Sequence, residues 1–199
     1  MASPGGSQVD ENGAVTTAVE SRATAVRAVL RRFQEGYQTR DLTELDAFMD
    51  LFVSGDQAEL IGIGATERGG YEWFQGSEAI RGVIESDWTY WGDVTIDIEG
   101  ARISVSREVS WLSTTGWLRQ TQTFDQALRF YLEQMKGLLD NTALGPDDRL
   151  MEATHYGLRR LRERDKGQGY AWPFVLTAVL VRERDGWRFH TLHWSMPVD

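Results

Sequence analysis

The sequence contains no cysteine and no long apolar run, and each absence excludes a class of protein. Without cysteine the chain cannot form a disulfide scaffold, supply a thiol nucleophile or bind zinc or an iron–sulfur cluster through thiolates. No apolar run reaches the roughly 18 residues that a membrane span requires. Basic residues are in the minority, 21 against 30 acidic ones, and the net charge of -9 opposes binding to a phosphate backbone. We therefore expect neither a membrane protein nor a nucleic-acid partner.

Histidine is also scarce, and the three histidines are placed where they cannot share a metal ion. His190 and His193 fall on the last predicted strand at an odd spacing, which sends their side chains to opposite faces. His155 stands alone on a predicted helix. We therefore expect no metal site. The glycine-rich segment 62–67 ends in glutamate where a dinucleotide-binding loop needs glycine, and we expect no cofactor.

The chain length of 199 residues fits one domain. Residues 1–14 have neither a basic flank nor an apolar stretch, which predicts a disordered N-terminal tail and not a signal peptide. We expect a single domain over 15–199 and a cytoplasmic location.

Apolar residues repeat with two different spacings in this domain, one typical of helices and one typical of strands. Apolar residues at steps of three and four predict helices over 17–39 and 76–91, with a short helix between them that Asp41 caps. Alternating apolar residues predict strands, which are expected at 58–63, at 71–75, in a meander from 93 to 117, and in a closing hairpin of 174–181 and 187–196. The fold class is therefore α+β.

A helical hairpin is expected to interrupt the strands at about 120–168. Thr123 and Gln126 form a capping box, and Pro146 fits the first position of a second helix. The insertion carries more apolar surface than two helices can bury against each other, which indicates a lid or an interface.

Aromatic residues are abundant, and their positions predict a pocket. The eight tryptophans avoid the helical insertion and gather on the strands and on the helix over 76–91. Asp87 lies within the apolar stripe of that helix, and burial there would raise the pKa of its carboxyl and suit it to general base catalysis. A purely structural role, in which Asp87 ties the helix to the sheet by a hydrogen bond, is the alternative.

The last strand supplies the second group of candidates. Regular alternation places His193 on one face with Trp187 and Ser195, and places Trp194 on the opposite face, where it would mark a contact surface. His193 is either a pocket residue or a core histidine with satisfied hydrogen bonds. Glu72, between aromatic residues, is either a helix cap, a partner for a tryptophan or arginine, or a pocket acid.

Taken together, these segments resemble one protein family. They are similar to the SnoaL-like branch of the NTF2-like superfamily. The similarity lies in a long first helix followed by a short second one, the segment Glu72-Trp73-Phe74-Gln75-Gly76, the Asp87-Trp88 pair, the strand Val109-Ser110-Trp111-Leu112-Ser113-Thr114, and the hairpin Asp185-Gly186-Trp187-Arg188 before His193-Trp194-Ser195. The resemblance covers about 17–118 and 172–197. The helical insertion departs from the family pattern.

The resemblance implies a cone in which a bent antiparallel sheet wraps around the N-terminal helices and encloses a cavity, in a homodimer packed through the sheet. In enzymes of the superfamily, such as ketosteroid isomerase and scytalone dehydratase, inward Asp, Tyr or His groups move protons beside a carbonyl. By position, Asp87 and His193 match these inward groups, and Tyr37 matches the phenol donor of the first helix more loosely.

Two functions are compatible with these residues. The first is binding of a small apolar ligand in an aromatic-lined cavity, without catalysis. The second is a cofactor-free isomerase, dehydratase or cyclase in which Asp87 takes a proton while His193 or Tyr37 stabilises the oxyanion. The residues expected to line the pocket in either case are Glu72, Trp73, Trp88, Trp111, Trp187 and Ser195.

Overall fold

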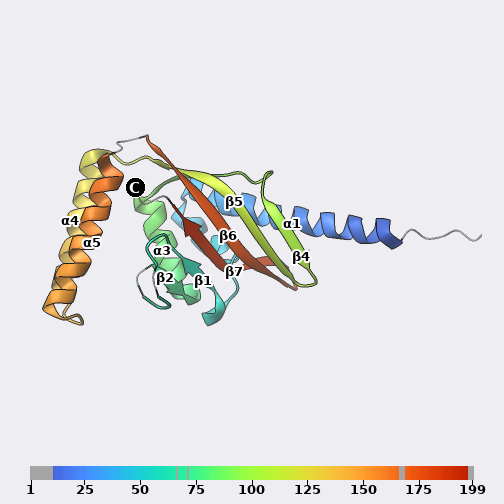
Figure 1. Ribbon diagram of the computed structural model, residues 1–199, viewed down its shortest axis with the longest axis horizontal. Coiled ribbons are helices and arrows are strands. Elements are labelled where there is room, and N and C mark those ends of the chain that lie inside the picture. The colour runs from blue at the N-terminus through green and yellow to red at the C-terminus, as the bar shows by residue number, and fades with distance from the viewer. Residues whose placement is uncertain (1–10, 66, 71, 166–168, 197–199) are drawn as a thin grey trace, which may run out of the picture.

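The apolar face predicted for the first helix is buried in the computed structural model, which describes residues 11–65, 67–70, 72–165 and 169–196 (Figure 1). Helix α1 (Glu11–Thr39) buries Val26, Leu30, Phe33 and Tyr37 completely. It begins earlier than expected, so residues 11–14 are helical and do not belong to a disordered tail. This stretch opens on an acidic residue, which a helix N-terminus favours. The rest of the predicted tail, 1–10, lies outside the described residues.

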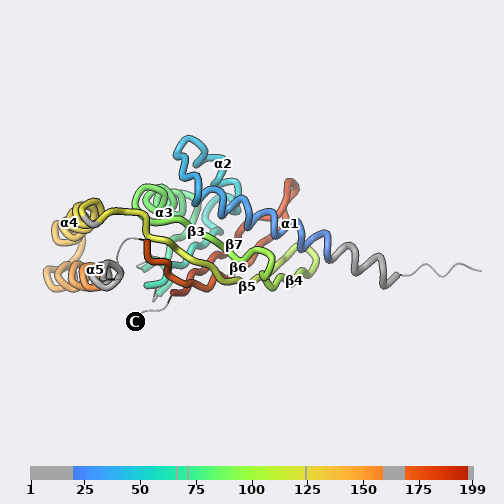
Figure 2. Tube along the Cα trace, turned by 90° about the horizontal axis from the view of Figure 1, so that it is seen from above, coloured from blue at the N-terminus to red at the C-terminus, as the bar shows by residue number. Residues whose placement is uncertain are grey.

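A seven-stranded sheet lies along one side of α1 (Figure 2). Its strand order is β2-β1-β7-β6-β5-β3, with β4 paired to β5. The strands are β1 (Glu59–Ile61), β2 (Trp73–Gln75), β3 (Gly92–Ile96), β4 (Arg102–Ser106), β5 (Val109–Gln120), β6 (Ala171–Glu183) and β7 (Gly186–Ser195).

The sheet is mixed and not purely antiparallel as expected. All its pairings are antiparallel except that of β1 with β7, which is parallel. These two strands are far apart in the chain, so no tight turn forces them to run in opposite directions. The predicted closing hairpin of β6 and β7 is present and turns at Arg184 and Asp185. The predicted meander over 93–117 is wrong in its pairing, because β3 and β4 both pair with the long strand β5 and not with each other.

The remaining helices of the body pack on the same face of the sheet as α1 (Figure 2). They are η1 (Leu42–Glu44), α2 (Leu45–Met49), η2 (Gly55–Gln57) and α3 (Gly76–Tyr90). Asp41 caps η1 as predicted, because its carboxylate accepts a hydrogen bond from the Thr43 amide. Phe33, Phe52 and Phe189 form the centre of the core, with Phe33 and Phe189 ring centroids 5.5 Å apart.

The predicted helical insertion is confirmed. Helices α4 (Phe124–Asp140) and α5 (Pro146–Asp165) form a hairpin between β5 and β6. The capping box is present: the Thr123 hydroxyl accepts from the Gln126 amide, and the Gln126 side chain accepts from the Thr123 amide. Figure 1 shows the hairpin at one end of the sheet, with the beginning of α1 at the other. In the part of the chain that the structure describes, no helix is both long and apolar enough to cross a membrane.

Candidate functional site

The structure brings together two of the predicted site residues, Tyr37 of α1 and Asp87 of α3. The Tyr37 hydroxyl donates a hydrogen bond to Asp87 Oδ2 over 2.9 Å. Tyr37 is fully buried and Asp87 is half-buried. The Asp87 carboxylate therefore lies between the buried Tyr37 phenol and the partly exposed side of α3.

The environment of Tyr37 keeps its hydroxyl protonated. Burial raises the pKa of Tyr37 well above its ordinary value of 10.0, and the negative charge and hydrogen bond of Asp87 raise it further. A phenolate at this position would be both desolvated and next to a carboxylate. The Tyr37 hydroxyl is therefore protonated at neutral pH and acts as a hydrogen-bond donor to Asp87.

Helix α3 presents two apolar faces, and Asp87 belongs to the second. The face toward the core carries Ile80, Ile84 and Trp88. The other face carries Val83 and Asp87 at successive turns, followed by Trp91 at the C-cap, and these residues line a cavity of about 190 Å³. The single stripe expected from the sequence is therefore divided between core and cavity, since neighbouring helix positions are rotated by about 100°.

Four parts of the fold contribute walls to this cavity: α3, the β1–β2 hairpin, β7 and the helical insertion. The lining residues are Leu60, Gly62, Ile63, Glu72, Phe74, Val83, Ser86, Asp87, Trp91, Phe130, Gln134, Tyr156 and Trp194. Its volume is below the range of roughly 300–1,000 Å³ that is typical of sites for drug-sized ligands. The cavity suits a small molecule with an apolar body.

The helical insertion contributes three cavity residues that were not predicted from the sequence. Phe130 of α4 stacks on Tyr90 of α3, with ring centroids 3.9 Å apart and an interplanar angle of 17°. Phe130, Gln134 and Tyr156 all line the cavity. The aromatic residues of α4 were visible as part of an amphipathic helix, but their contact with α3 depends on where the insertion leaves the sheet.

Glu72 lines the cavity, which is the position expected of a pocket acid, and it also stabilises the turn between β1 and β2. Its carboxylate Oε2 accepts a hydrogen bond from the Gly64 amide, and its carbonyl accepts from the Gly62 amide over 2.7 Å. The backbone of Glu72 is left-handed, with φ of 56°. A Cβ atom at position 62 would lie 2.8 Å from Glu72 Oε2, so this turn requires glycine there.

His193 is not beside Asp87, and a β-bulge is the reason. In the pairing of β6 with β7, Leu180 faces Phe189 while Val179 faces Thr191, which leaves His190 as an extra residue. Beyond it the alternation is inverted, and His193 lies in an open groove on the outer face of the sheet with Trp111. The prediction that His193 and Asp87 lie in the same pocket is therefore wrong.

The same bulge moves Trp194 from the expected contact surface into the core. Trp194 is buried and lines the cavity, with its ring 5.5 Å from Trp91 and 6.1 Å from Tyr37. Ser195, which was expected in the pocket, is exposed on the outer side.

Of the other residues predicted to line the pocket, Trp88 and Trp187 are buried in the core. Trp111 is 50% exposed in the outer groove, and Trp73 is half-buried on β2 without lining the cavity. The two tryptophans that line the cavity, Trp91 and Trp194, are not among those predicted to do so.

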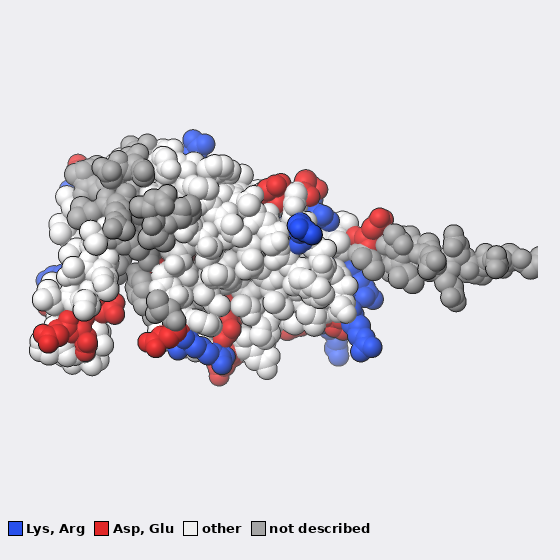
Figure 3. Space-filling view, viewed as in Figure 1, with Lys and Arg blue, Asp and Glu red and all other residues white. Residues whose placement is uncertain are grey.

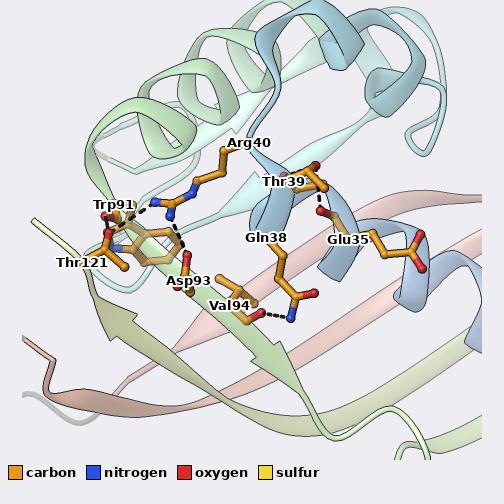
Figure 4. A network of polar contacts seen from close by, with 9 residues as sticks. Glu35, Gln38, Thr39, Arg40, Trp91, Asp93, Val94 and Thr121 are labelled. Carbon is orange, nitrogen blue, oxygen red and sulfur yellow. Dashed lines mark hydrogen bonds and ion pairs between the residues drawn. The ribbon is translucent and has the colours of Figure 1, made fainter.

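A second polar cluster fixes the point where the insertion leaves the body (Figure 4). The Arg40 guanidinium binds Asp93 at 2.5 Å and donates to the Thr121 hydroxyl at 3.4 Å. The Thr121 hydroxyl in turn donates to the Trp91 carbonyl at 3.5 Å. The cluster therefore links the end of α1, the end of α3 and the segment before α4, and it holds Trp91 at the cavity wall.

The outer face of the sheet is almost free of charged side chains over β5, β6 and β7 (Figure 3). Trp111 and Trp117 project from it, 50% and 54% exposed. The expected homodimer through this face stays a prediction.

Comparison with known proteins identifies the fold. No family model matches the sequence, and no curated protein matches it. Solved structures do match: a candidate dehydratase of the NTF2-like family from Streptomyces avermitilis has a TM-score of 0.56 at 12% identity, covering 90% of this chain and 99% of its own. An NTF2-like protein with a cystatin-like fold from Novosphingobium aromaticivorans has a TM-score of 0.56 at 11% identity, with coverage of 97% and 93%. An NTF2-like superfamily protein from Salmonella enterica reaches 0.55 at 12% identity, with coverage of 90% and 94%. The chain has the NTF2-like fold, with its cystatin-like sheet and a helical hairpin inserted between β5 and β6.

Proposed function

We propose that this protein binds a small, mostly apolar molecule in the cavity beside α3, with a polar group of the ligand at Asp87. The observation that carries the proposal is the placement of Asp87 among rings: Phe74, Trp91, Phe130 and Trp194 line the same cavity. Flat apolar walls with two carboxylate residues, Asp87 and Glu72, favour a ligand that has an apolar body and a hydrogen-bond donor. The similarity to a candidate dehydratase of the same fold supports a small-molecule ligand.

Tyr37 gives the carboxylate its orientation. Its hydroxyl donates to Asp87 Oδ2 from the core side. A carboxylate can accept further hydrogen bonds at its other lone pairs, so a ligand hydroxyl or amine can bind the same group from the cavity. This arrangement pre-orders the polar end of the site before the ligand arrives, which lowers the entropy cost of binding.

Mass spectrometry of small molecules released from the purified full-length protein tests the proposal. Ser86→Phe places a ring in the cavity that Ser86 lines, whereas Ser113→Phe makes the same change on the exposed outer side of β5. We expect a compound that accompanies the wild type and Ser113→Phe but is absent from Ser86→Phe. Equal amounts in both variants would contradict binding in this cavity.

Proton transfer is the second candidate function, and the contact between Asp87 and Tyr37 favours it. In an isomerisation, the Asp87 carboxylate would remove a proton from the carbon next to a carbonyl and return it to another carbon, so that the reaction needs no cofactor. His193 lies on the outer face and the single Tyr37 hydroxyl hydrogen goes to Asp87, so neither predicted oxyanion donor lines the cavity, and the role left to Tyr37 is to orient the base. Turnover of a panel of enones and hydroxyketones by wild type, with loss in Asp87→Asn, would establish catalysis. Equal rates for both proteins would restrict the function to binding.

A further inference from the structure

The described residues that line the cavity beside α3 carry charge of one sign. Asp87 and Glu72 are acidic, and none of the other described lining residues is lysine, arginine or histidine. The uncharged polar side chains among them are Ser86, Gln134 and Tyr156. A cleft whose charges all have one sign attracts ligands of the opposite sign and repels those of the same sign. These walls therefore favour a cationic ligand over an anionic one.

Both carboxylates are oriented by hydrogen bonds from neutral donors. Asp87 Oδ2 accepts from the Tyr37 hydroxyl at 2.9 Å, and Glu72 Oε2 accepts from the Gly64 amide. Neither donor brings a positive charge, so these bonds position the carboxylates without cancelling their charge. A carboxylate has about four acceptor sites, so one such bond does not use up its capacity for a donor on a ligand.

Aromatic rings surround the Asp87 side of the cavity. Trp91 and Trp194 both line it, and their ring planes meet at 74° with centroids 5.5 Å apart. The Tyr37 ring, whose hydroxyl binds Asp87, lies 6.2 Å from the Trp91 ring and 6.1 Å from the Trp194 ring. The carboxylate is therefore close to two rings set at a steep angle to each other. The face of an aromatic ring attracts a cation within about 6 Å, whereas a neutral apolar group gains only burial there.

An organic cation fits these walls better than a metal ion or an alcohol. Among the residues that the structure describes, no group of three or more histidine, cysteine, aspartate and glutamate side chains is placed to hold a metal ion. Most of the lining residues are apolar, whereas calcium takes about six to eight oxygen ligands. An alcohol would pair with a carboxylate but leave its charge uncompensated. An ammonium group compensates that charge and also interacts with the rings.

We propose that the ligand of this cavity is a small protonated amine with an apolar body, whose ammonium group binds Asp87 beside the rings of Trp91 and Trp194. Glu72 adds a second negative charge to the same walls. This ligand class rests on the proposed function, and it narrows the ligand from any compound with a hydrogen-bond donor to a cation. The cavity volume of about 190 Å³ limits the apolar body to a small group such as a single ring.

Calorimetric titration of the full-length protein with three probes tests the charge of the ligand. Benzylamine, benzyl alcohol and benzoate share a phenyl ring, and at neutral pH they carry a positive, no and a negative charge. We expect benzylamine to bind at least about tenfold more tightly than benzyl alcohol, and benzoate to bind more weakly than either. Ser86→Phe, which places a ring in the cavity, should abolish binding of benzylamine, and Ser113→Phe on the outer side of β5 should not.

The outcomes of this titration separate the amine from the proposed function. If benzyl alcohol binds as tightly as benzylamine and Ser86→Phe abolishes both, the ligand is not a cation, while binding of a small apolar molecule stands. Failure of benzylamine to bind also overturns the amine. A compound that is released from wild type, lacks a basic nitrogen and is absent from Ser86→Phe would likewise overturn the amine and support the proposed function.

Asp87→Asn tests the partner of the ammonium group, because it removes the charge and keeps the shape of the side chain. We expect benzylamine to bind at least about tenfold more weakly to this variant, and benzyl alcohol to lose much less. A loss of equal size for both probes would mean that Asp87 maintains the shape of the cavity and does not bind the ammonium group.

Opposite substitutions at Gln134 test the electrostatics without changing either acid. Gln134 lines the cavity from α4 and is exposed, so the helix can carry either charge there. Gln134→Glu should bind benzylamine about two- to tenfold more tightly than Gln134→Lys, and added salt should reduce the difference. Both variants should bind benzyl alcohol alike, and the same two substitutions at Ser113 should leave both affinities unchanged. Equal affinity of Gln134→Glu and Gln134→Lys for benzylamine overturns the proposal.

Discussion

Tyr37 and Asp87 are 50 residues apart in the chain, and a 2.9 Å hydrogen bond joins them where α1 meets α3. Since Tyr37 is fully buried, this hydrogen bond holds the polar centre of the cavity in place from the core side. The contact ties α1 to α3 and orients the carboxylate that lines the cavity.

Removing the Tyr37 hydroxyl should therefore affect stability and ligand binding together. Tyr37→Phe keeps the ring and deletes the donor, and we expect it to lower the free energy of unfolding by about 1–2 kcal/mol in urea titrations. Tyr90→Phe serves as control, because the Tyr90 ring is stacked at the surface. In a double-mutant cycle with Asp87→Asn, the two losses should not add. Additive losses would mean that the hydrogen bond contributes nothing to either property.

The raised pKa of Tyr37 predicts a loss of stability in alkali. The unfolded chain releases the Tyr37 proton near pH 10, while the folded chain retains it to higher pH because of burial and Asp87. The stabilisation is fully present below pH of about 10 and falls as the pH rises toward the folded pKa, by up to about 1.4 kcal/mol per pH unit. Unfolding in urea between pH 9 and 11 should show this slope in wild type and a shallower one in Tyr37→Phe. An identical slope in both proteins would contradict it.

The sequence predicted the elements of this fold well because most of them are specified locally. Asp41 and the Thr123–Gln126 capping box mark helix starts, and the alternation in 109–117 marks a strand with one buried face. Such signals need only a few neighbouring residues. The parallel contact of β1 with β7 has no local signal, since it forms between segments that meet only in the folded chain.

The candidate site was predicted less well, and one extra residue accounts for much of the error. His190 forms a bulge in β7, and every later side chain of the strand changes face. Trp194 thereby enters the cavity and His193 leaves it. Alternation alone cannot reveal a bulge, because its position depends on the register with β6.

His193 should consequently be dispensable for the cavity. We expect His193→Ala to change the free energy of unfolding by less than about 0.5 kcal/mol, since the residue lies in an open groove on the outer face. Its content of co-purified small molecule should equal that of wild type, whereas Asp87→Ala should lose it. A loss in His193→Ala comparable to that in Asp87→Ala would show that the outer groove takes part in the function.

Phe130 should anchor the helical insertion to the body, because its ring stacks on Tyr90 at 3.9 Å. Phe130→Ala removes that stacking and one wall of the cavity, and we expect faster hydrogen exchange across α4 and α5 with little change in β5 and β6. The matched control is Leu132→Ala on the same helix, where the side chain is exposed and makes no part of the cavity. Equal exchange in the two variants would mean that the insertion is held by contacts other than Phe130.

Gly116→Ala and Gly82→Ala compare a tightly packed glycine with one that has open space around it. A Cβ at Gly116 would lie 2.3 Å from the Phe174 ring and 2.4 Å from the Thr95 carbonyl, so Gly116→Ala must shift β5 or its neighbours. We expect a loss of about 1–3 kcal/mol in the free energy of unfolding. Gly82, in the middle of α3, has nothing within 4 Å of the added atom, and Gly82→Ala should gain about 0.5–1 kcal/mol from helix propensity. Urea titration of both variants gives the comparison, and a Gly116→Ala protein as stable as wild type would be inconsistent with the packing of β3 and β6 around β5.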